Sequence, residues 1–158
     1  DKVYNPDQKR FVFMEFYDAP NKDQTMIEIL PILGNVSGVE RAFAKYFAKK
    51  GHDVLIVARQ DSDRDSLTNF LLKAEHIPDI ETARHLIDLM NEQQLRDNSH
   101  ALDHFPHRQV AVFGISMGSI DALNLTAYDP RITCTVAGLP SMPIPYPSTP
   151  VSSASSTT

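Results

Sequence analysis

The stretch RQVAVFGISMGSIDALN, residues 108–124, constrains the fold more than any other part of the sequence. A short apolar run is followed by Gly114, Ser116 and Gly118, and then by a segment with the apolar spacing of a helix. A side chain at either glycine would collide with a neighbouring strand or with the helix behind it. The stretch therefore predicts a strand that turns sharply into a helix, with Ser116 at the corner.

Strand-like and helix-like segments alternate along the rest of the chain. Apolar, β-branched runs predict strands at residues 11–17, 26–33, 54–57, 110–113 and 132–137. Helical spacing and end signals predict helices from about 38 to 50, from 79 to about 94 and from 116 to 128, with a further helical turn around 67–74. Residues 54–57 are entirely apolar, which is typical of a strand covered on both faces. The pattern predicts an α/β fold: a mostly parallel sheet with helices on both faces, in three α/β/α layers.

The start and end of the first helix are marked by specific residues. Ser37 and Glu40 have the spacing of a capping box, in which each side chain binds a free backbone amide of the first turn. Lys49 and Lys50 precede Gly51, so cations meet the negative end of the helix and glycine supplies a left-handed cap.

Length and charge limit what the chain can be. The 158 residues suffice for one domain, with 42% hydrophobic and 22% charged residues and no apolar stretch long enough to span a membrane. We expect a core over residues 1–140 and a separate Pro/Ser/Thr-rich low-complexity tail over residues 141–158. The net charge of −5, with basic residues spread along the chain, predicts no nucleic-acid partner.

The cysteine content bears on the cellular compartment. Cys134 is the only cysteine, so no internal disulfide can form, and its neighbours Ile132 and Val136 predict a buried, inert thiol. This favours a reducing compartment such as the cytoplasm, although the localisation stays open.

The corner at Ser116 matches a known catalytic pattern. Residues Gly114 to Gly118 read Gly-Ile-Ser-Met-Gly, the G-x-S-x-G nucleophile elbow, with a predicted strand before it and a predicted helix after it. Over about residues 11–140 the chain resembles the α/β-hydrolase family, and within it the dienelactone hydrolases and esterases. The order of strands and helices up to the elbow is similar to that of the family.

The resemblance implies roles for several residues. Ser116 would be the nucleophile that accepts an acyl group from a small-molecule substrate, without metal or cofactor. The backbone amides of Met117 and Asn35 would form the oxyanion hole, because the segment Pro31-Ile32-Leu33-Gly34-Asn35 resembles the one that follows the family's third strand. An ordinary glycine turn that leads into a helix explains this segment equally well.

The chain departs from the family after the elbow. The family places an acid and a histidine downstream of the nucleophile, whereas residues 132–158 contain neither a charged residue nor a histidine. We therefore expect the sheet to lack the family's last strands. His52 and His107 precede strands and fall at the opposite edge of a parallel sheet; His76, in the long connection after residue 57, is the one histidine that could approach the elbow.

Two functions remain open from the sequence. One is a serine hydrolase of carboxylic esters or related acyl compounds, incomplete in this chain. The other is a catalytically inactive domain of the same fold that binds proteins or associates with itself through an open sheet edge after residues 132–137. Residues Asp61 to Ser66 resemble a calcium loop but lack its glycine, and Leu72 stands where the loop needs glutamate, so we expect no metal site.

Overall fold

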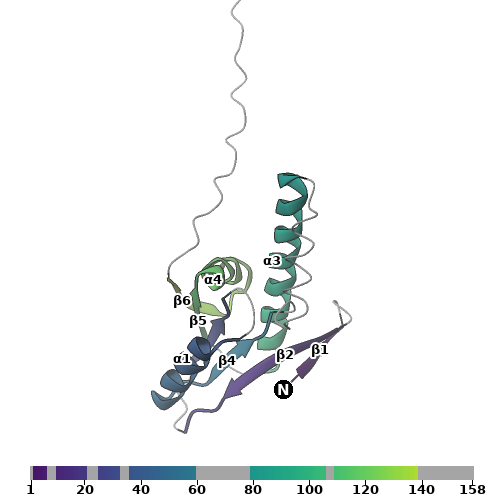
Figure 1. Cartoon of the computed structure of the whole chain (residues 1–158). Coiled ribbons are helices and arrows are strands. Elements are labelled where there is room, and N and C mark those ends of the chain that lie inside the picture. Colours follow the sequence, from purple (N-terminus) through teal and green to yellow (C-terminus); the bar gives the residue numbers. More distant parts are fainter. Residues whose placement is uncertain are drawn as a thin grey trace, which may run out of the picture.

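The chain folds around one six-stranded sheet, most of which is parallel (Figure 1). The computed structural model describes residues 2–6, 10–20, 25–32, 36–59, 79–105 and 109–138. Across the sheet the order is β1 (Lys2–Asn5), β2 (Arg10–Tyr17), β4 (Val54–Val57), β3 (Thr25–Leu30), β5 (Gln109–Ile115) and β6 (Ile132–Gly138). The pairings β1–β2 and β2–β4 are antiparallel, and the strands from β4 to β6 run parallel. The predicted fold class is confirmed.

Helices cover both faces of the sheet, so the molecule has three layers (Figure 1). Helix α1 (Gly38–Lys49) packs on the face that carries Ile27 and Ile29. Helices α3 (Ile80–Leu102) and α4 (Met117–Tyr128) pack on the face that carries Met26 and Leu30. All residues of β4 are inaccessible to solvent, as its apolar composition predicts.

The ends of helix α1 follow the sequence signals. The Ser37 side chain accepts a hydrogen bond from the Val39 amide, while the Glu40 carboxylate accepts one from the Ser37 amide, which confirms the capping box. At the other end Gly51 has φ of 100°, the left-handed conformation expected of the residue that ends the helix.

Two element ends differ from the prediction by several residues. Helix α3 begins after its cap Asp79 as expected but continues to Leu102 instead of ending near residue 94. Strand β3 ends at Leu30 instead of residue 33, because Pro31 has no amide hydrogen for the ladder. The sequence analysis missed β1. The predicted turn at 67–74 and the tail at 141–158 lie outside the described residues.

The prediction that Cys134 is buried is wrong, because the thiol is exposed. Helix α4 covers one face of β6, where the Thr126 and Thr135 hydroxyls share a hydrogen bond of 2.5 Å. Side chains alternate along a strand, so Cys134 and Val136 face the other side. Val136 is 50% exposed, so the apolar neighbours of Cys134 do not bury it.

Candidate active site

Ser116 occupies the junction between β5 and α4 in an unusual backbone conformation. Its φ is 57° and its ψ is −122°, and among the described residues it is the only non-glycine residue with positive φ. Such a conformation costs about 1–3 kcal/mol and persists only where the surrounding structure enforces it. The side chain is exposed at the carboxyl end of the sheet. The corner therefore presents a hydroxyl to solvent at the first turn of a helix.

The two glycines of the motif allow this corner to form. A Cβ atom at Gly114 would lie 2.0 Å from the carbonyl oxygen of Gly118, and one at Gly118 would lie 2.2 Å from the carbonyl oxygen of Leu30. Both distances are far below van der Waals contact, and both neighbours are backbone atoms. The start of α4 thus rests directly on the ends of β5 and β3.

Backbone hydrogen bonds hold Ser116 on both sides. Its amide donates to the carbonyl oxygen of Gly138 at the end of β6, over 3.0 Å. Its own carbonyl oxygen accepts from the amide of Ser119 over 3.0 Å and from the Ser119 hydroxyl over 2.5 Å. Met117 is the first residue of α4, where backbone amides have no partner within the helix and the dipole favours negative charge. An anion that forms beside Ser116 would meet these amides.

Only the first two residues of the predicted oxyanion segment, Pro31 and Ile32, are described. Residues 33–35, Asn35 among them, lie outside the described residues. On either side of them, the amides of Ile32 and Ser37 donate to the two carboxylate oxygens of Glu40, over 3.1 and 2.8 Å. Burial by itself raises the pKa of Glu40, but hydrogen bonds from Ser37 and Ile32 outweigh it and hold the pKa below its usual value. Glu40 is therefore ionised at neutral pH.

A buried ion pair lies beside the same segment. Arg59, which follows β4, pairs with Asp121 of α4, and its guanidinium also donates to the carbonyl oxygen of Pro31 over 3.3 Å. The side chains of Arg59 and Asp121 are 3% and 2% exposed. The sequence analysis missed both residues. The available signals were a charge directly after an entirely apolar strand and a charge inside an otherwise apolar helix.

The described histidines make their contacts elsewhere. The ring of His52 lies 3.3 Å from the carbonyl oxygen of Thr25, at the start of β3, and therefore at the edge of the sheet opposite Ser116. The ring of His100 lies 3.1 Å from the carbonyl oxygen of Tyr4. His76 and His107 are outside the described residues.

Two features are absent from the described part of the chain: a metal-binding group and a membrane-spanning helix. Within the described ranges, no group of three or more His, Cys, Asp or Glu side chains is placed to hold a metal ion. The stretch 61–66 that resembles a calcium loop lies outside those ranges. None of the described helices combines the length and hydropathy that a bilayer crossing requires.

Comparison with known proteins identifies the fold. No family model and no curated protein matches the sequence. Among solved structures, the α/β hydrolase GrgF from Penicillium sp. sh18 matches with a TM-score of 0.61 and 15% identity, over 85% of this chain and 43% of that one. The dienelactone hydrolase-like promiscuous phosphotriesterase P91 from metagenomic libraries matches with a TM-score of 0.59 and 17% identity, over 87% and 58%. A putative dienelactone hydrolase from Klebsiella pneumoniae subsp. pneumoniae MGH 78578 matches with a TM-score of 0.58 and 15% identity, over 87% and 59%.

At such low identity these matches establish the architecture alone, and the chain spans about half the length of the structures it matches. The chain has part of the α/β-hydrolase fold.

Proposed function

We propose that the chain carries the nucleophile site of a serine hydrolase that acts on carboxylic esters or related acyl compounds. The observation that supports this most directly is the conformation of Ser116, which is strained, exposed and placed at the N-terminus of a helix. A plain glycine turn between a strand and a helix gains nothing from holding a serine at positive φ. A nucleophile gains exposure and nearby amide donors.

In the proposed reaction, Oγ of Ser116 adds to the carbonyl carbon of the substrate and gives its proton to solvent water. The carbonyl oxygen becomes an anion, which the backbone amides of Met117 and Asn35 stabilise by hydrogen bonds. The bond between the carbonyl carbon and the leaving oxygen then breaks, and the alcohol departs with a proton. Water later adds to the acyl group on Ser116 and releases the carboxylic acid.

Efficient catalysis also requires a side chain that accepts the proton of Ser116. A serine hydroxyl becomes a good nucleophile when a histidine accepts its proton, and residues 132–158 contain no histidine and no acid. We therefore expect this chain to react with a strong acylating or phosphonylating agent, and to turn over ordinary esters poorly by itself. Labelling therefore tests whether Ser116 is reactive, whereas ester turnover tests whether a proton acceptor assists it.

A fluorophosphonate probe tests the proposal. The folded wild-type chain should acquire one phosphonyl group on the peptide that contains Ser116, measured by mass spectrometry, and Ser116→Ala should stay unlabelled. The urea-unfolded wild-type chain is the matched control and should react no faster than free serine. Equal labelling of the wild type and Ser116→Ala would refute the proposal.

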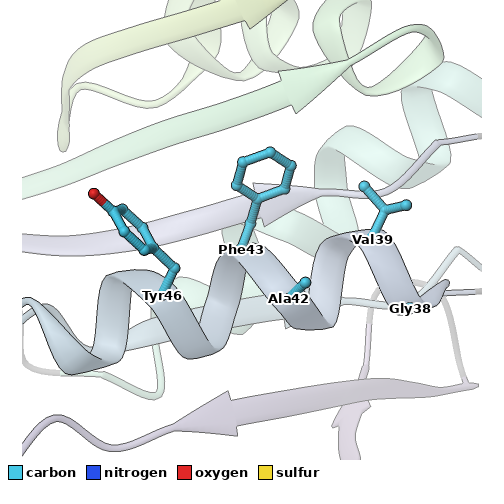
Figure 2. Close-up of a pocket in the computed structure, with 5 residues that line it drawn as sticks. All are labelled: Gly38, Val39, Ala42, Phe43 and Tyr46. Atoms are coloured by element: carbon cyan, nitrogen blue, oxygen red, sulfur yellow. The ribbon is translucent and has the colours of Figure 1, made fainter.

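A second candidate function, self-association, is favoured by the surface on the α1 side of the sheet. Phe43 of α1 packs against Phe113 of β5 with ring centroids 4.9 Å apart and the rings tilted by 49°, and Phe113 lies next to Val136 in the β5–β6 register. An apolar hollow of about 490 Å³ continues this surface along α1, where Val39 and Tyr46 are more than half exposed (Figure 2).

We propose that the partner is a second copy of this chain, paired through β6. In the described structure β6 pairs on one side only, with β5, and it contains no charged residue and no proline to block another strand. Two copies of β6 related by a two-fold axis at Thr135 would run antiparallel and place Cys134 opposite Val136.

Sedimentation velocity over a range of concentrations tests the pairing. We expect a dimer for the wild type and a folded monomer for Val136→Glu, because the axis would bring two added charges close together. Leu89→Glu, which places the same charge at an exposed position of α3 on the other face of the sheet, is the control. A wild type that stays a folded monomer at high concentration contradicts the second candidate.

A further inference from the structure

One side chain, Glu40, accepts hydrogen bonds from both ends of the connection between β3 and α1. The Ile32 amide, just before the undescribed residues 33–35, donates to Oε1 of Glu40, and the Ser37 amide, just after them, donates to Oε2. A single carboxylate therefore holds both ends of this connection. In an ordinary capping box the glutamate binds only the amide of the capping residue, so the bond from Ile32 is additional to what helix α1 requires.

Glu40 is suited to hold these amides firmly. The residue is 4% exposed, and the Ser37 hydroxyl also donates to the same carboxylate. Hydrogen bonds to an ionised acceptor are about twice as strong as bonds between neutral groups, and shielding from water strengthens them further. The Ser37 hydroxyl oxygen in turn accepts from the Val39 amide, so the Glu40 carboxylate is tied to the first turn of helix α1.

A second buried charge holds the same connection from the other side. Arg59 donates to the carbonyl oxygen of Pro31 and pairs with Asp121, which lies on the first turns of α4. A Cβ at Gly118 would also touch the Pro31 carbonyl oxygen, at 3.1 Å, so the connection lies against the start of α4. The residues around Pro31 are thus fixed relative to the helix that carries Ser116 and Met117.

We propose that Glu40 is a positioning residue for acyl transfer at Ser116, because its carboxylate fixes the backbone at Ile32 and Ser37 beside the start of α4, which carries Ser116 and Met117. This inference rests on the proposed function. Glu40 touches no reacting atom. It acts by fixing backbone amides, and misplacement by about 1 Å can lower a rate about 100-fold.

Amide hydrogen exchange tests the two hydrogen bonds to Glu40 and does not depend on an activity measurement. In the wild type the Ile32 and Ser37 amides should be protected at neutral pH, and Glu40→Gln should lower the protection of at least one of them roughly tenfold, because a glutamine side chain presents one acceptor where the carboxylate presents two. Ser37→Ala is the matched control: it removes the hydroxyl that caps α1 and donates to Glu40, and it keeps both backbone amide bonds to the carboxylate. In the wild type, protection of both amides should also fall when the pH drops through the pKa of Glu40.

The rate of fluorophosphonate labelling tests the consequence. Glu40→Gln should react about 100-fold more slowly than the wild type, whereas Ser37→Ala should stay near the wild-type rate at equal folded fraction. The wild-type rate should decline in acid with the same midpoint as the protection of Ile32, and Glu40→Gln should lack that decline. A merely structural role would slow both variants in proportion to their loss of stability.

The outcomes separate the inference from the proposed function. Unchanged protection of Ile32 and Ser37 in Glu40→Gln, or equal labelling rates for Glu40→Gln and Ser37→Ala, overturns the positioning role while Ser116 stays a nucleophile. A wild-type chain that is not labelled at Ser116 refutes the proposed function, and the positioning role with it, even where exchange shows both hydrogen bonds.

Discussion

The Glu28 carboxyl group should lower the free energy of unfolding as the pH rises above about 4.5, and Glu28→Gln should remove this pH dependence. The residue lies in the middle of β3 and is 0% exposed. Alternation along the strand places it on the same face as Met26 and Leu30, beneath α3 and α4. Within the described residues, neither of its carboxylate oxygens has a hydrogen-bond partner.

Burial raises the pKa of Glu28 well above its usual value, and the negative charge of Asp129 raises it further, against a smaller opposing effect of Arg131. In the unfolded chain the carboxyl group ionises near pH 4.5. Between that pH and the folded pKa, only the unfolded state is ionised, so the free energy of unfolding falls by about 1.4 kcal/mol per pH unit. Below pH 4.5 both states are protonated and the penalty is absent.

Urea denaturation of the wild type and Glu28→Gln between pH 4 and pH 8 measures this penalty. The stability advantage of the variant should start to grow above about pH 4.5, with a slope of about 1.4 kcal/mol per pH unit, and level off at the folded pKa. Subtracting the two curves cancels every other titrating group.

Glu15→Gln is a control of opposite sign. The hydrogen bond from Arg41 lowers the pKa of Glu15, so this carboxylate stabilises the folded state above the usual glutamate pKa and loses that effect as the pH falls. A difference between Glu28→Gln and wild type that does not vary between pH 5 and pH 7 would refute the reasoning, because it would mean that the Glu28 carboxylate is solvated in the folded state.

Three further predictions concern packing and charge. Gly118→Ala should lower the free energy of unfolding by about 1–3 kcal/mol in thermal denaturation, because the added Cβ meets the Leu30 carbonyl oxygen; an unchanged melting temperature would contradict the close approach. Asp121→Leu should destabilise the chain by about 3–5 kcal/mol in urea by leaving Arg59 buried without its carboxylate, and adding Arg59→Met should recover most of the loss; a double variant no more stable than the single one would argue against the ion pair. Asp129→Asn should be less stable than wild type at pH 7 and match it near pH 2, because burial raises the pKa of Asp129 less than its hydrogen bonds lower it; a gap that persists in acid would exclude this linkage.

The sequence predicted the elements and the corner because their signals are local. Apolar spacing of about two or four residues separates strands from helices, and β4, α1 and α4 fall where that spacing places them. The Ser37 and Glu40 pair marks the start of α1 with its own hydrogen bonds. The motif around Ser116 spans five consecutive residues, Gly114 to Gly118, so the signal for the strained turn is also local.

The side-chain contacts near Ser116 could not be predicted in the same way, because they join residues that are distant in the sequence. Arg59 and Asp121 stand 62 residues apart, and no periodicity relates them. Glu40 was recognised as a helix cap, yet its bond to Ile32 depends on how β3 and α1 meet in space. Polar pairs of this kind follow from strand order and layer packing, which a single sequence does not display.

The sequence by itself determined most of the segments that form strands and helices, and that a serine stands at a glycine-flanked corner between two of them. The tertiary structure alone decided what each side chain meets. Glu28, one charge in an apolar run, became buried because α3 and α4 close over its face of β3. Cys134, with Ile132 and Val136 two positions away on either side, is exposed because α4 covers the opposite face of β6. Periodicity is a property of neighbours along the chain, whereas burial depends on which distant element covers a face.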